Sequence, residues 1–278
     1  MNRFKRVKYP DGQISAKYDP PTNPLYFNNV FGPPPPIAER INSYEDLFYV
    51  RAISDIIQNM GISRLDIVNR LFIPCMFGQR SDRRFDRMQS FDLKLIADII
   101  NECNFEEVEI FDPHSDVVLS LINRSYKRSS INYVTQAVED IFDKKQGPLV
   151  LISPDAGAYK KVFEYGQTLD LEVLAAVKHR GYDGNVNLTF TGDVAHKNCL
   201  IVDDLCDGGF TFTTLAEELY KRGALKIFLY VSHGIFSKGF TELSKRIDHI
   251  YTTNSVKDID FTGENEVLKQ LITQFKVI

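Results

Sequence analysis

An apolar run that ends in two adjacent acids, Asp203 and Asp204, is the feature of this chain best suited to chemistry. The run predicts a buried parallel strand, and Gly208 and Gly209 allow a tight turn into a helix-compatible segment from Thr213 to Arg222. Such a turn can aim several N–H groups at an anion, while the acids hold ribose hydroxyls or a metal beside it. The pattern therefore predicts a site for a phosphorylated sugar.

Two further polar motifs directly follow predicted strands. Asp155 comes after the strand 149–152 and a proline, so it either caps the next helix or lies near a metal or sugar at the sheet edge. His114 follows the strand 108–111 and is either a packed or capping histidine or a contact to Mg²⁺ or ATP. A histidine is an unusual Mg²⁺ ligand because that ion prefers oxygen.

Two clusters of cations also follow strands. Arg80 opens a basic segment that runs to Arg87, and this segment is either a solvated surface or a site for a triphosphate. Guanidinium groups suit the second role because they bind phosphate oxygens in pairs. Lys178 and Arg180 open a polar loop that extends to Gly184. This loop is either simply exposed or a cationic lid that closes over transferring phosphates.

The composition of the 278 residues, 44% apolar and 25% charged, is that of a soluble globular protein. The net charge of −4 gives no reason to expect nucleic acid as a partner. The chain lacks a signal region and any apolar run long enough to cross a bilayer, so we expect no membrane partner. The four cysteines form neither a CxxC pair nor a zinc spacing, which favours reduced thiols in a cytoplasmic protein.

Segments with helical spacing alternate with short apolar runs along most of the chain, which predicts an α/β fold with parallel sheets. The predicted helices cover about 44–60, 91–103, 131–142, 158–167 and 213–222, and the predicted strands 68–74, 108–111, 149–152, 171–177, 188–191, 200–204 and 226–231. Residues 1–40 are proline-rich and are expected to form an irregular surface strap. A loop near residue 145 divides the chain into two domains, 1–145 and 146–278, each a doubly wound sheet with ligands beyond the carboxyl ends of its strands.

Seven segments, in the same order along the chain, resemble motifs of the ribose-phosphate pyrophosphokinases (phosphoribosyl-diphosphate synthetases). They are Tyr9–Gln13 (similar to F-S-D-G-E), Ile73–Arg83 (I-P-Y-F-x-Y-A-R-Q-D-R), Asp112–Ser115 (D-L-H-A), Ser153–Gly157 (S-P-D-A-G), Lys178–Arg180 (K-x-R), Val202–Thr211 (V-D-D-x-x-D-T-G-G-T) and Ser232–Ser237 (T-H-G-I/L-F-S). Seven matches in order make coincidence improbable. The resemblance implies two sheets of the type I phosphoribosyltransferase kind, an N-terminal ATP-binding domain and a C-terminal phosphoribosyl-binding domain.

The resemblance also implies a reaction. The β,γ-diphosphate of ATP passes to the anomeric hydroxyl of a 5-phosphorylated ribose and leaves AMP, with Mg²⁺ as the cofactor. By the same resemblance, Lys178 and Arg180 are catalytic and His114 and Asp155 lie at Mg²⁺ sites. The implied ATP-binding residues are Tyr9, Asp11, Gln13, Arg80, Asp82 and His114, the first three from a neighbouring subunit of a homo-oligomer. The implied ribose-phosphate-binding residues are Asp203, Asp204, Asp207, Gly208, Gly209, Phe210 and Thr211, with His233 nearby in a structural role.

The chain departs from the family pattern where the sugar phosphate is expected. Phe210 puts a bulky aromatic into the phosphate loop. The ring either faces a larger 5-substituent, as in ADP-ribose, or packs inward and leaves a plain ribose 5-phosphate as the acceptor. Ser81 and Gln13 also replace family residues, and the family's first strand and helix are missing before Tyr9, so we expect a shortened first sheet. A phosphoribosyltransferase and a non-catalytic regulatory relative are the alternative functions.

Overall fold

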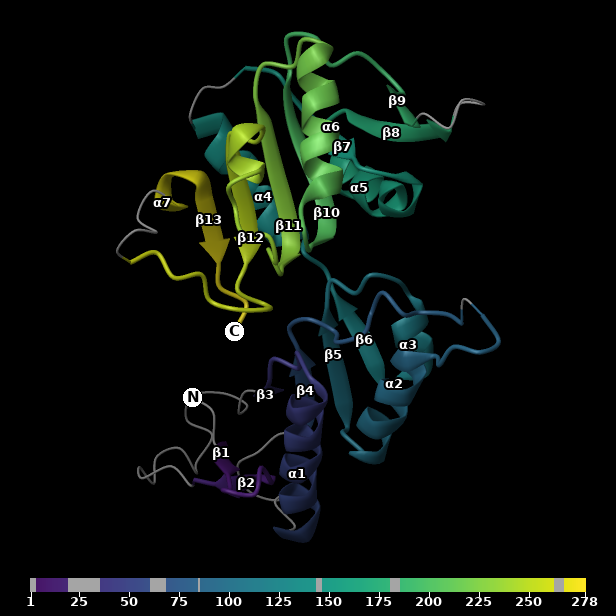
Figure 1. Ribbon diagram of the computed structural model, residues 1–278, viewed down its shortest axis with the longest axis vertical. Helices are drawn as coiled ribbons and strands as arrows, with labels where there is room; N and C mark the ends of the chain where they lie inside the picture. The colour runs from purple at the N-terminus through teal and green to yellow at the C-terminus, as the bar shows by residue number, and fades with distance from the viewer. Residues whose placement is uncertain are drawn as a thin grey trace. The chain divides into compact units, whose positions relative to one another are not determined.

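The computed structural model divides the chain into two compact units, Met1–Ser129 with Ile278, and Ser130–Val277 (Figure 1). It describes residues 4–19, 36–60, 69–84, 86–143, 147–180, 186–262 and 268–278. Each unit is built on its own parallel sheet with helices against it, which confirms the predicted α/β class.

The first unit contains a four-stranded parallel sheet with the strands in chain order. Its strands are β3 (Ile37–Ala38), β4 (Arg70–Ile73), β5 (Glu107–Phe111) and β6 (Ser125–Arg128), and its helices are α1 (Tyr44–Met60), α2 (Asp92–Glu102) and α3 (Val117–Leu121). Apolar residues at helical spacing in α1, among them Val50 and Ile53, share one core with Leu71 and Ile110 of the sheet. Because β4 and β5 are parallel neighbours, the loops that follow them leave the sheet at the same edge.

A hairpin precedes this sheet where an irregular strap was expected. Its strands, β1 (Phe4–Lys8) and β2 (Ile14–Tyr18), are antiparallel, and Gly12 takes a φ of +89° in the turn between them. Phe4 and Ile14 are buried in the core that also contains α1. The strap prediction is therefore wrong for residues 4–19, whose apolar side chains pack, and residues 20–35 lie outside the described part of the chain.

The boundary between the units falls earlier than the predicted division between residues 145 and 146. Helix α4 (Ile131–Asp143) belongs to the second unit, because Val134, Ala137 and Ile141 pack in one core with Leu151 and Leu200 of its sheet. The polar segment just before α4, which carried no strand prediction, forms the edge strand β6.

The second unit contains a seven-stranded sheet in the order β13-β12-β11-β10-β7-β8-β9. Its strands are β7 (Leu149–Ser153), β8 (Val173–Arg180), β9 (Val186–Phe190), β10 (Asn198–Cys206), β11 (Ile227–Gly234), β12 (His249–Thr253) and β13 (Ile272–Phe275). Its further helices are α5 (Ala156–Leu169), α6 (Phe210–Lys221) and α7 (Leu268–Leu271), and a 3₁₀ turn spans Leu243–Lys245. The strands are parallel except β9, which runs antiparallel to β8.

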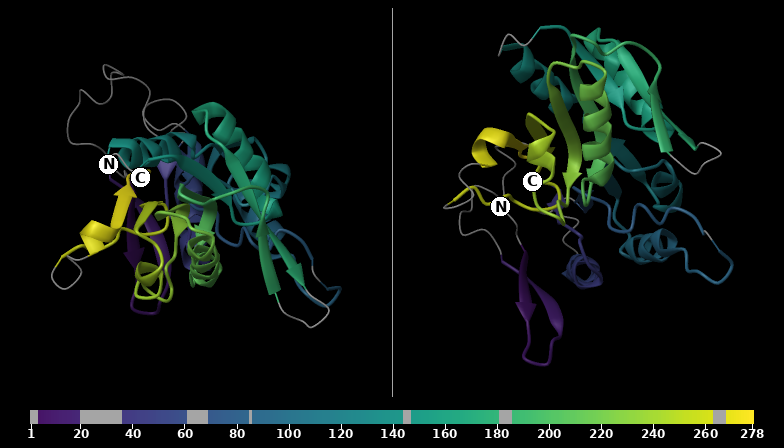
Figure 2. Two further views of the ribbon diagram at one scale, coloured as in Figure 1. Left: turned by 90° about the horizontal axis from the view of Figure 1, so that it is seen from above. Right: turned by 45° about the horizontal axis from the view of Figure 1, so that its top comes forward.

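Alternate residues of β10 face opposite cores, so this sheet is doubly wound. Leu200 and Val202 lie in the core with α4 and α5, whereas Ile201 lies in the core with α6. Strand β8 pairs with β7 only as far as Ala175, and from Ala176 onward it pairs with β9. Figure 2 shows β8 and β9 extending from the sheet as a two-stranded ribbon.

Candidate functional site

The winding direction of the second sheet reverses between β7 and β10. The chain passes from β7 to β8 on one side, whereas β10 and β11 continue on the other. In sheets of this kind ligands bind beyond the carboxyl ends of the strands at such a reversal. Ile152 of β7 lies opposite Ile201 of β10, after which β10 continues to Cys206. The acids at the end of β10 and Asp155 after β7 are thus placed at this edge.

The two adjacent acids form a tightly coupled pair. Asp204 is 7% exposed, and its backbone N–H donates to Oδ1 of Asp203 at 2.9 Å. Burial, followed by the neighbouring Asp204 charge, raises the pKa of Asp203 well above its usual value, and Lys161 of α5 opposes this rise. Hydrogen-bond donors or a cation stabilise the charged form of a carboxylate pair that is desolvated in this way. Two vicinal hydroxyl groups supply such donors, and a bound metal ion supplies such a cation.

The turn after the acids depends on Gly209. This residue takes a φ of +80° and precedes the first turn of α6, and a Cβ added to it would lie 3.0 Å from Cδ2 of Leu243. Strand β10 ends at Cys206 and α6 starts at Phe210, so the turn is tighter than expected. The N–H groups of Phe210 and Thr211 lie where a helix offers donors to an anion.

A second loop holds this turn from one side. The hydroxyl of Ser237 donates to Oδ1 of Asp207 at 2.6 Å, and the N–H of Ser237 donates to the carbonyl of Asp207 at 3.1 Å. Cγ of Lys238 lies 3.5 Å from the position that a Cβ on Gly208 would occupy. The loop after β11 thereby fixes the Asp207 side chain and places a lysine next to the predicted phosphate loop.

Phe210 is 81% exposed at the first position of α6. The ring therefore does not pack inward, while the choice between the two acceptors stays a prediction. Thr211, beside it, is also exposed. The ring is available to a ligand bound at the turn.

Asp155 caps a helix, as one of its two interpretations predicts. Its Oδ1 accepts the N–H of Ala158 at 2.9 Å, and its carbonyl accepts the hydroxyl of Ser153 at 2.8 Å. The cap fixes the carboxylate at the end of β7, where its metal role stays a prediction.

The backbone of Lys178 and Arg180 belongs to β8, whereas the sequence predicted that the polar loop begins there. In the pairing with β9, Lys178 lies opposite Leu188 and Arg180 opposite Val186. The side chains of residues 178–187 and the whole of residues 181–185 lie outside the described part of the chain.

In the first unit, Gln79 links the loops that follow β4 and β5. Its side-chain oxygen accepts the N–H of His114 at 3.0 Å, and its amide nitrogen lies 3.8 Å from Sγ of Cys75. Arg80 and His114 are both exposed, and Asp82 lies 3.9 Å from Nε of Arg83. The structure therefore joins two of the segments predicted to bind ATP.

The segment from Tyr9 to Gln13 forms the turn of the β1–β2 hairpin. The N–H of Tyr9 donates to the carbonyl of Gln13 at 2.9 Å, and Oδ1 of Asp11 accepts the N–H of Gln13 at 3.0 Å. The hairpin packs on α1 through Ile14, while the Tyr9 side chain is 47% exposed. Asp11 thus shapes the turn, and Tyr9 stands on the surface.

Within the described residues, no three His, Cys, Asp or Glu side chains gather into a group that could hold a metal ion. Mg²⁺ usually keeps several waters and binds through one or two carboxylates together with substrate phosphates. The carboxylates at the ends of β7 and β10 are ligands of that type. They fit an ion that arrives with a phosphorylated substrate better than a permanent protein cage.

Several residues of the site carry no recognisable pattern in the sequence. Gln79, Lys161 and Lys238 act across loops or elements that are brought together only by folding. His233 is fully buried, and its Nδ1 lies 2.9 Å from Oγ of Ser255. This position in β11, next to Leu205 of β10, fits the structural role expected for it.

No helix in the described part of the chain is long and apolar enough to span a membrane.

Comparisons with known proteins find relatives of the kind that the motifs indicate. The family described as "Phosphoribosyl synthetase-associated domain" matches residues 150–267. A ribose-phosphate pyrophosphokinase of Mycoplasmopsis pulmonis is 30% identical over 68% of this chain and 60% of its own length. One from Pyrococcus furiosus is 29% identical over 76% of this chain and 75% of its own. The chain thus spans less than two thirds of the first of these relatives.

The fold comparison extends over almost the whole chain. The crystal structure of phosphoribosylpyrophosphate synthetase from Mycobacterium smegmatis superposes with a TM-score of 0.79 at 17% identity, and the match covers 99% of this chain and 86% of that one. This likeness establishes the type I phosphoribosyltransferase fold. By sequence, the chain is similar to ribose-phosphate pyrophosphokinases over about two thirds to three quarters of its length.

Proposed function

We propose that this protein transfers the β,γ-diphosphate of ATP to the anomeric C1 hydroxyl of a 5-phosphorylated ribose. The bond from C1 oxygen to the β-phosphorus forms, the bond between the α,β-bridging oxygen and the β-phosphorus breaks, and AMP leaves while the hydroxyl proton is released. The observation that carries the proposal is the Asp203–Asp204 pair followed by the Gly209 turn at the reversal between β7 and β10. The activity named for the relatives supports it.

The second unit binds the sugar in this proposal. Asp203 and Asp204 accept hydrogen bonds from the ribose hydroxyls, since both are acids at a strand end and one is nearly buried. The 5-phosphate lies at the start of α6, where the N–H groups of residues 208–211 donate to it. Asp207 is held by Ser237 and shapes this loop.

The first unit binds ATP. Arg80, Asp82 and His114 take the phosphates, and the Gln79 bridge between their loops supports a common role. Tyr9, Asp11 and Gln13 contact adenine from a neighbouring copy, which fits the exposed hairpin turn and makes a homo-oligomer the active form. The free buried cysteines among the described residues support a cytoplasmic site of action.

Charge neutralisation completes the reaction. Lys178 and Arg180 stabilise charge on the transferring diphosphate, because phosphoryl transfer depends mainly on alignment and electrostatics. Mg²⁺, when bound, neutralises phosphate oxygens. Asp155 and His114 are the proposed contacts to it, and Asp155 supplies the oxygen ligand that the ion prefers.

Phe210 favours ADP-ribose over ribose 5-phosphate as the acceptor. An exposed aromatic ring beside a phosphate loop stacks on a base or ring attached beyond that phosphate. Lys238, next to Gly208, adds a cation within reach of a second phosphate. Neither feature is needed for a plain monophosphate.

The test is mass analysis of the products formed from ATP, Mg²⁺ and either acceptor. We expect AMP and the 1-diphosphate of the sugar, with ADP-ribose used more efficiently. Phe210→Thr should lower kcat/KM for ADP-ribose by about 10-fold while changing that for ribose 5-phosphate much less. Phe142→Ala, which removes another exposed ring, is the control. An unchanged preference in Phe210→Thr would overturn the assignment of the acceptor.

The same assay separates the alternatives. A phosphoribosyltransferase would consume phosphoribosyl diphosphate with a nucleobase and would not need ATP. A regulatory relative would bind an active synthetase but turn over no ribose phosphate. The joined ATP segments of the first unit favour the diphosphokinase over both.

A further inference from the structure

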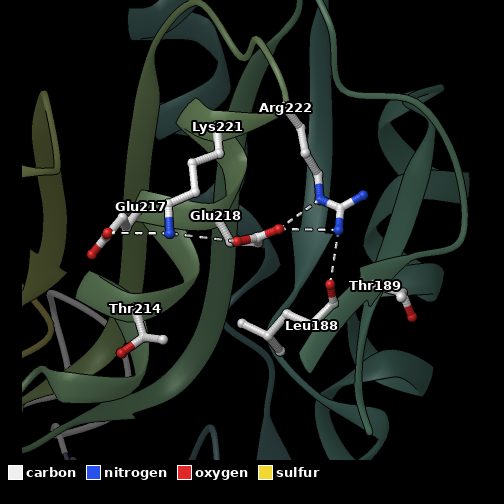
Figure 3. A pocket seen from close by; sticks show the side chains of 7 residues that line it. All are labelled: Leu188, Thr189, Thr214, Glu217, Glu218, Lys221 and Arg222. Carbon is white, nitrogen blue, oxygen red and sulfur yellow. Dashed lines mark hydrogen bonds and ion pairs between the residues drawn. The ribbon is translucent and has the colours of Figure 1, made fainter. Parts of the chain in front are cut away.

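A polar groove of about 390 Å³ lies between β9 and α6 (Figure 3). It is lined by Leu188, Thr189, Thr214, Glu217, Glu218, Lys221 and Arg222. Figure 3 shows the guanidinium of Arg222 reaching from the end of α6 toward the backbone of β9. The groove thus contains a direct link between the helix that begins at the sugar loop and the ribbon formed by β8 and β9.

Arg222 makes this link through several contacts. Its Nη2 donates to the carbonyl of Leu188 at 2.9 Å. Its Nε and Nη2 lie 3.1 Å and 3.0 Å from the same oxygen of Glu218, one turn earlier in α6. The guanidinium carbon also lies 5.2 Å from the ring centroid of Phe190. Glu218 and Phe190 therefore hold the guanidinium in the orientation that its bond to Leu188 needs.

The carbonyl that Arg222 holds belongs to the residue opposite Lys178. Leu188 pairs with Lys178 in the antiparallel register of β9 and β8. This part of β8 lies beyond Ala175, the last residue that pairs with β7, so β9 is its hydrogen-bonded neighbour there. The position of the Lys178 backbone consequently depends on where β9 is held.

We propose that Arg222 is a positioning residue for diphosphoryl transfer. It anchors β9 to α6, and through the β8–β9 register it fixes the backbone from which Lys178 extends. The inference rests on the proposed function, which places Lys178 at the transferring phosphates. A substitution far from the reacting atoms that misplaces a catalytic group by about 1 Å costs as much as 100-fold in rate. A loosened ribbon is therefore expected to lower kcat.

Lys221 is a matched neighbour for the control. It carries the same charge on the same helix, and its ion pairs are with Glu217 at 3.2 Å and Glu218 at 3.9 Å, both within α6. A pair within one exposed helix face contributes little to the fold. Lys221→Met therefore removes a charge from the groove and leaves the bond to Leu188 in place.

The experiment compares Arg222→Met, Arg222→Lys and Lys221→Met with the wild type in steady-state kinetics. We expect kcat of Arg222→Met to fall about 10-fold with KM for ATP and sugar changed less than about 2-fold, partial recovery in Arg222→Lys, and wild-type values in Lys221→Met. In a Lys178→Ala background, Arg222→Met should have no further effect, because the group that it positions is gone. An unchanged kcat, or the same loss in both backgrounds, would overturn the proposal.

Hydrogen exchange of the β9 amides separates this inference from the proposed function. Arg222→Met should accelerate exchange in residues 186–190 about 10-fold relative to Lys221→Met, while β11 exchanges as in the wild type. If the wild type forms no AMP, the proposed function fails, and accelerated exchange alone still supports the anchor. Unchanged exchange in Arg222→Met would rule out the anchor whether or not the protein is active.

Discussion

The side-chain oxygen of Gln79 accepts a hydrogen bond from the backbone N–H of His114 at 3.0 Å. Gln79 is 3% exposed, so the accepting side chain of this bond is buried, although His114 is exposed. It holds the loop after β4 against the loop after β5, and these loops carry Arg80 and His114. A buried amide thus brings together two segments that lie more than thirty residues apart in the chain.

Replacing Gln79 by Leu should weaken both the fold and ATP binding. The substitution removes the acceptor of the His114 N–H, which costs about 1 kcal/mol of the free energy of unfolding. We expect a lower unfolding temperature and a KM for ATP raised several-fold, measured by calorimetry and steady-state kinetics. Gln89→Leu, at an exposed glutamine two residues after the basic segment, is the control. Equal effects of the two changes would contradict the role of Gln79.

Gly209→Ala should damage the sugar loop more than a glycine substitution at similar backbone geometry elsewhere. An alanine there adopts a positive φ and also lies about 3 Å from Leu243, whereas Gly239 has a φ of +68° and nothing within 4 Å of an added Cβ. Positive φ alone costs about 1 kcal/mol. We expect Gly239→Ala to lose about that much free energy of unfolding and Gly209→Ala to lose clearly more. Gly209→Ala should also bind the sugar phosphate more weakly in calorimetric titration. Equal losses of stability in the two variants would show that the Leu243 side chain moves aside at little cost.

Two substitutions at Asp155 separate its cap from its proposed metal role. Asp155→Asn keeps an oxygen that accepts the N–H of Ala158, whereas Asp155→Ala removes it and should cost about 1 kcal/mol of stability. Both remove the negative charge, so both should raise the Mg²⁺ concentration needed for half-maximal activity. A Mg²⁺ dependence unchanged in Asp155→Asn would confine Asp155 to capping.

The coupled acids predict a pH dependence of stability. Burial, and then the charge of Asp204, raises the pKa of Asp203, so the folded protein keeps this proton to higher pH than the unfolded chain. Stability from this group therefore falls as pH rises from the unfolded value of about 3.9 through the raised folded pKa. We expect Asp203→Asn to be more stable than the wild type at pH 8, with the difference shrinking toward pH 4, and to lose turnover by about 100-fold.

Thermal unfolding of Asp203→Asn across this pH range tests the direction of the predicted pH dependence of stability. Glu139→Gln, at an exposed acid on α4, is the control and should unfold like the wild type at every pH. A pH-independent difference between Asp203→Asn and the wild type would show that the Asp203 charge is already compensated in the folded protein.

The elements that carry a strong apolar period were predictable from the sequence. Helix α1 was predicted at its observed bounds because Leu47, Val50 and Ile57 repeat at helical spacing and are all buried. Strands β7 and β10 were predicted because central parallel strands are apolar on both faces. The order of the polar motifs at their ends predicts a sugar-phosphate site, which stays a prediction.

The elements that were missed depend on tertiary contacts. Strand β6 is a polar edge strand, and the β1–β2 hairpin is defined by the packing of Phe4 and Ile14 on α1. Polar residues at Lys178 and Arg180 suggested a loop, although pairing with β9 extends β8 through them. The contacts of Gln79, Ser237 and Arg222 join segments that are distant in the chain, and no local sequence pattern indicates such contacts.

The fate of the β-phosphorus of ATP tests directly whether this protein transfers a diphosphate. The protein is incubated with ATP labelled at the β-phosphorus, Mg²⁺ and either ADP-ribose or ribose 5-phosphate, and the products are separated by charge. We expect unlabelled AMP, with all transferred label in a sugar that carries a diphosphate at C1, and no such product from Asp203→Asn/Asp204→Asn. Label retained in ADP as the nucleotide product, or no AMP with either sugar, would contradict it.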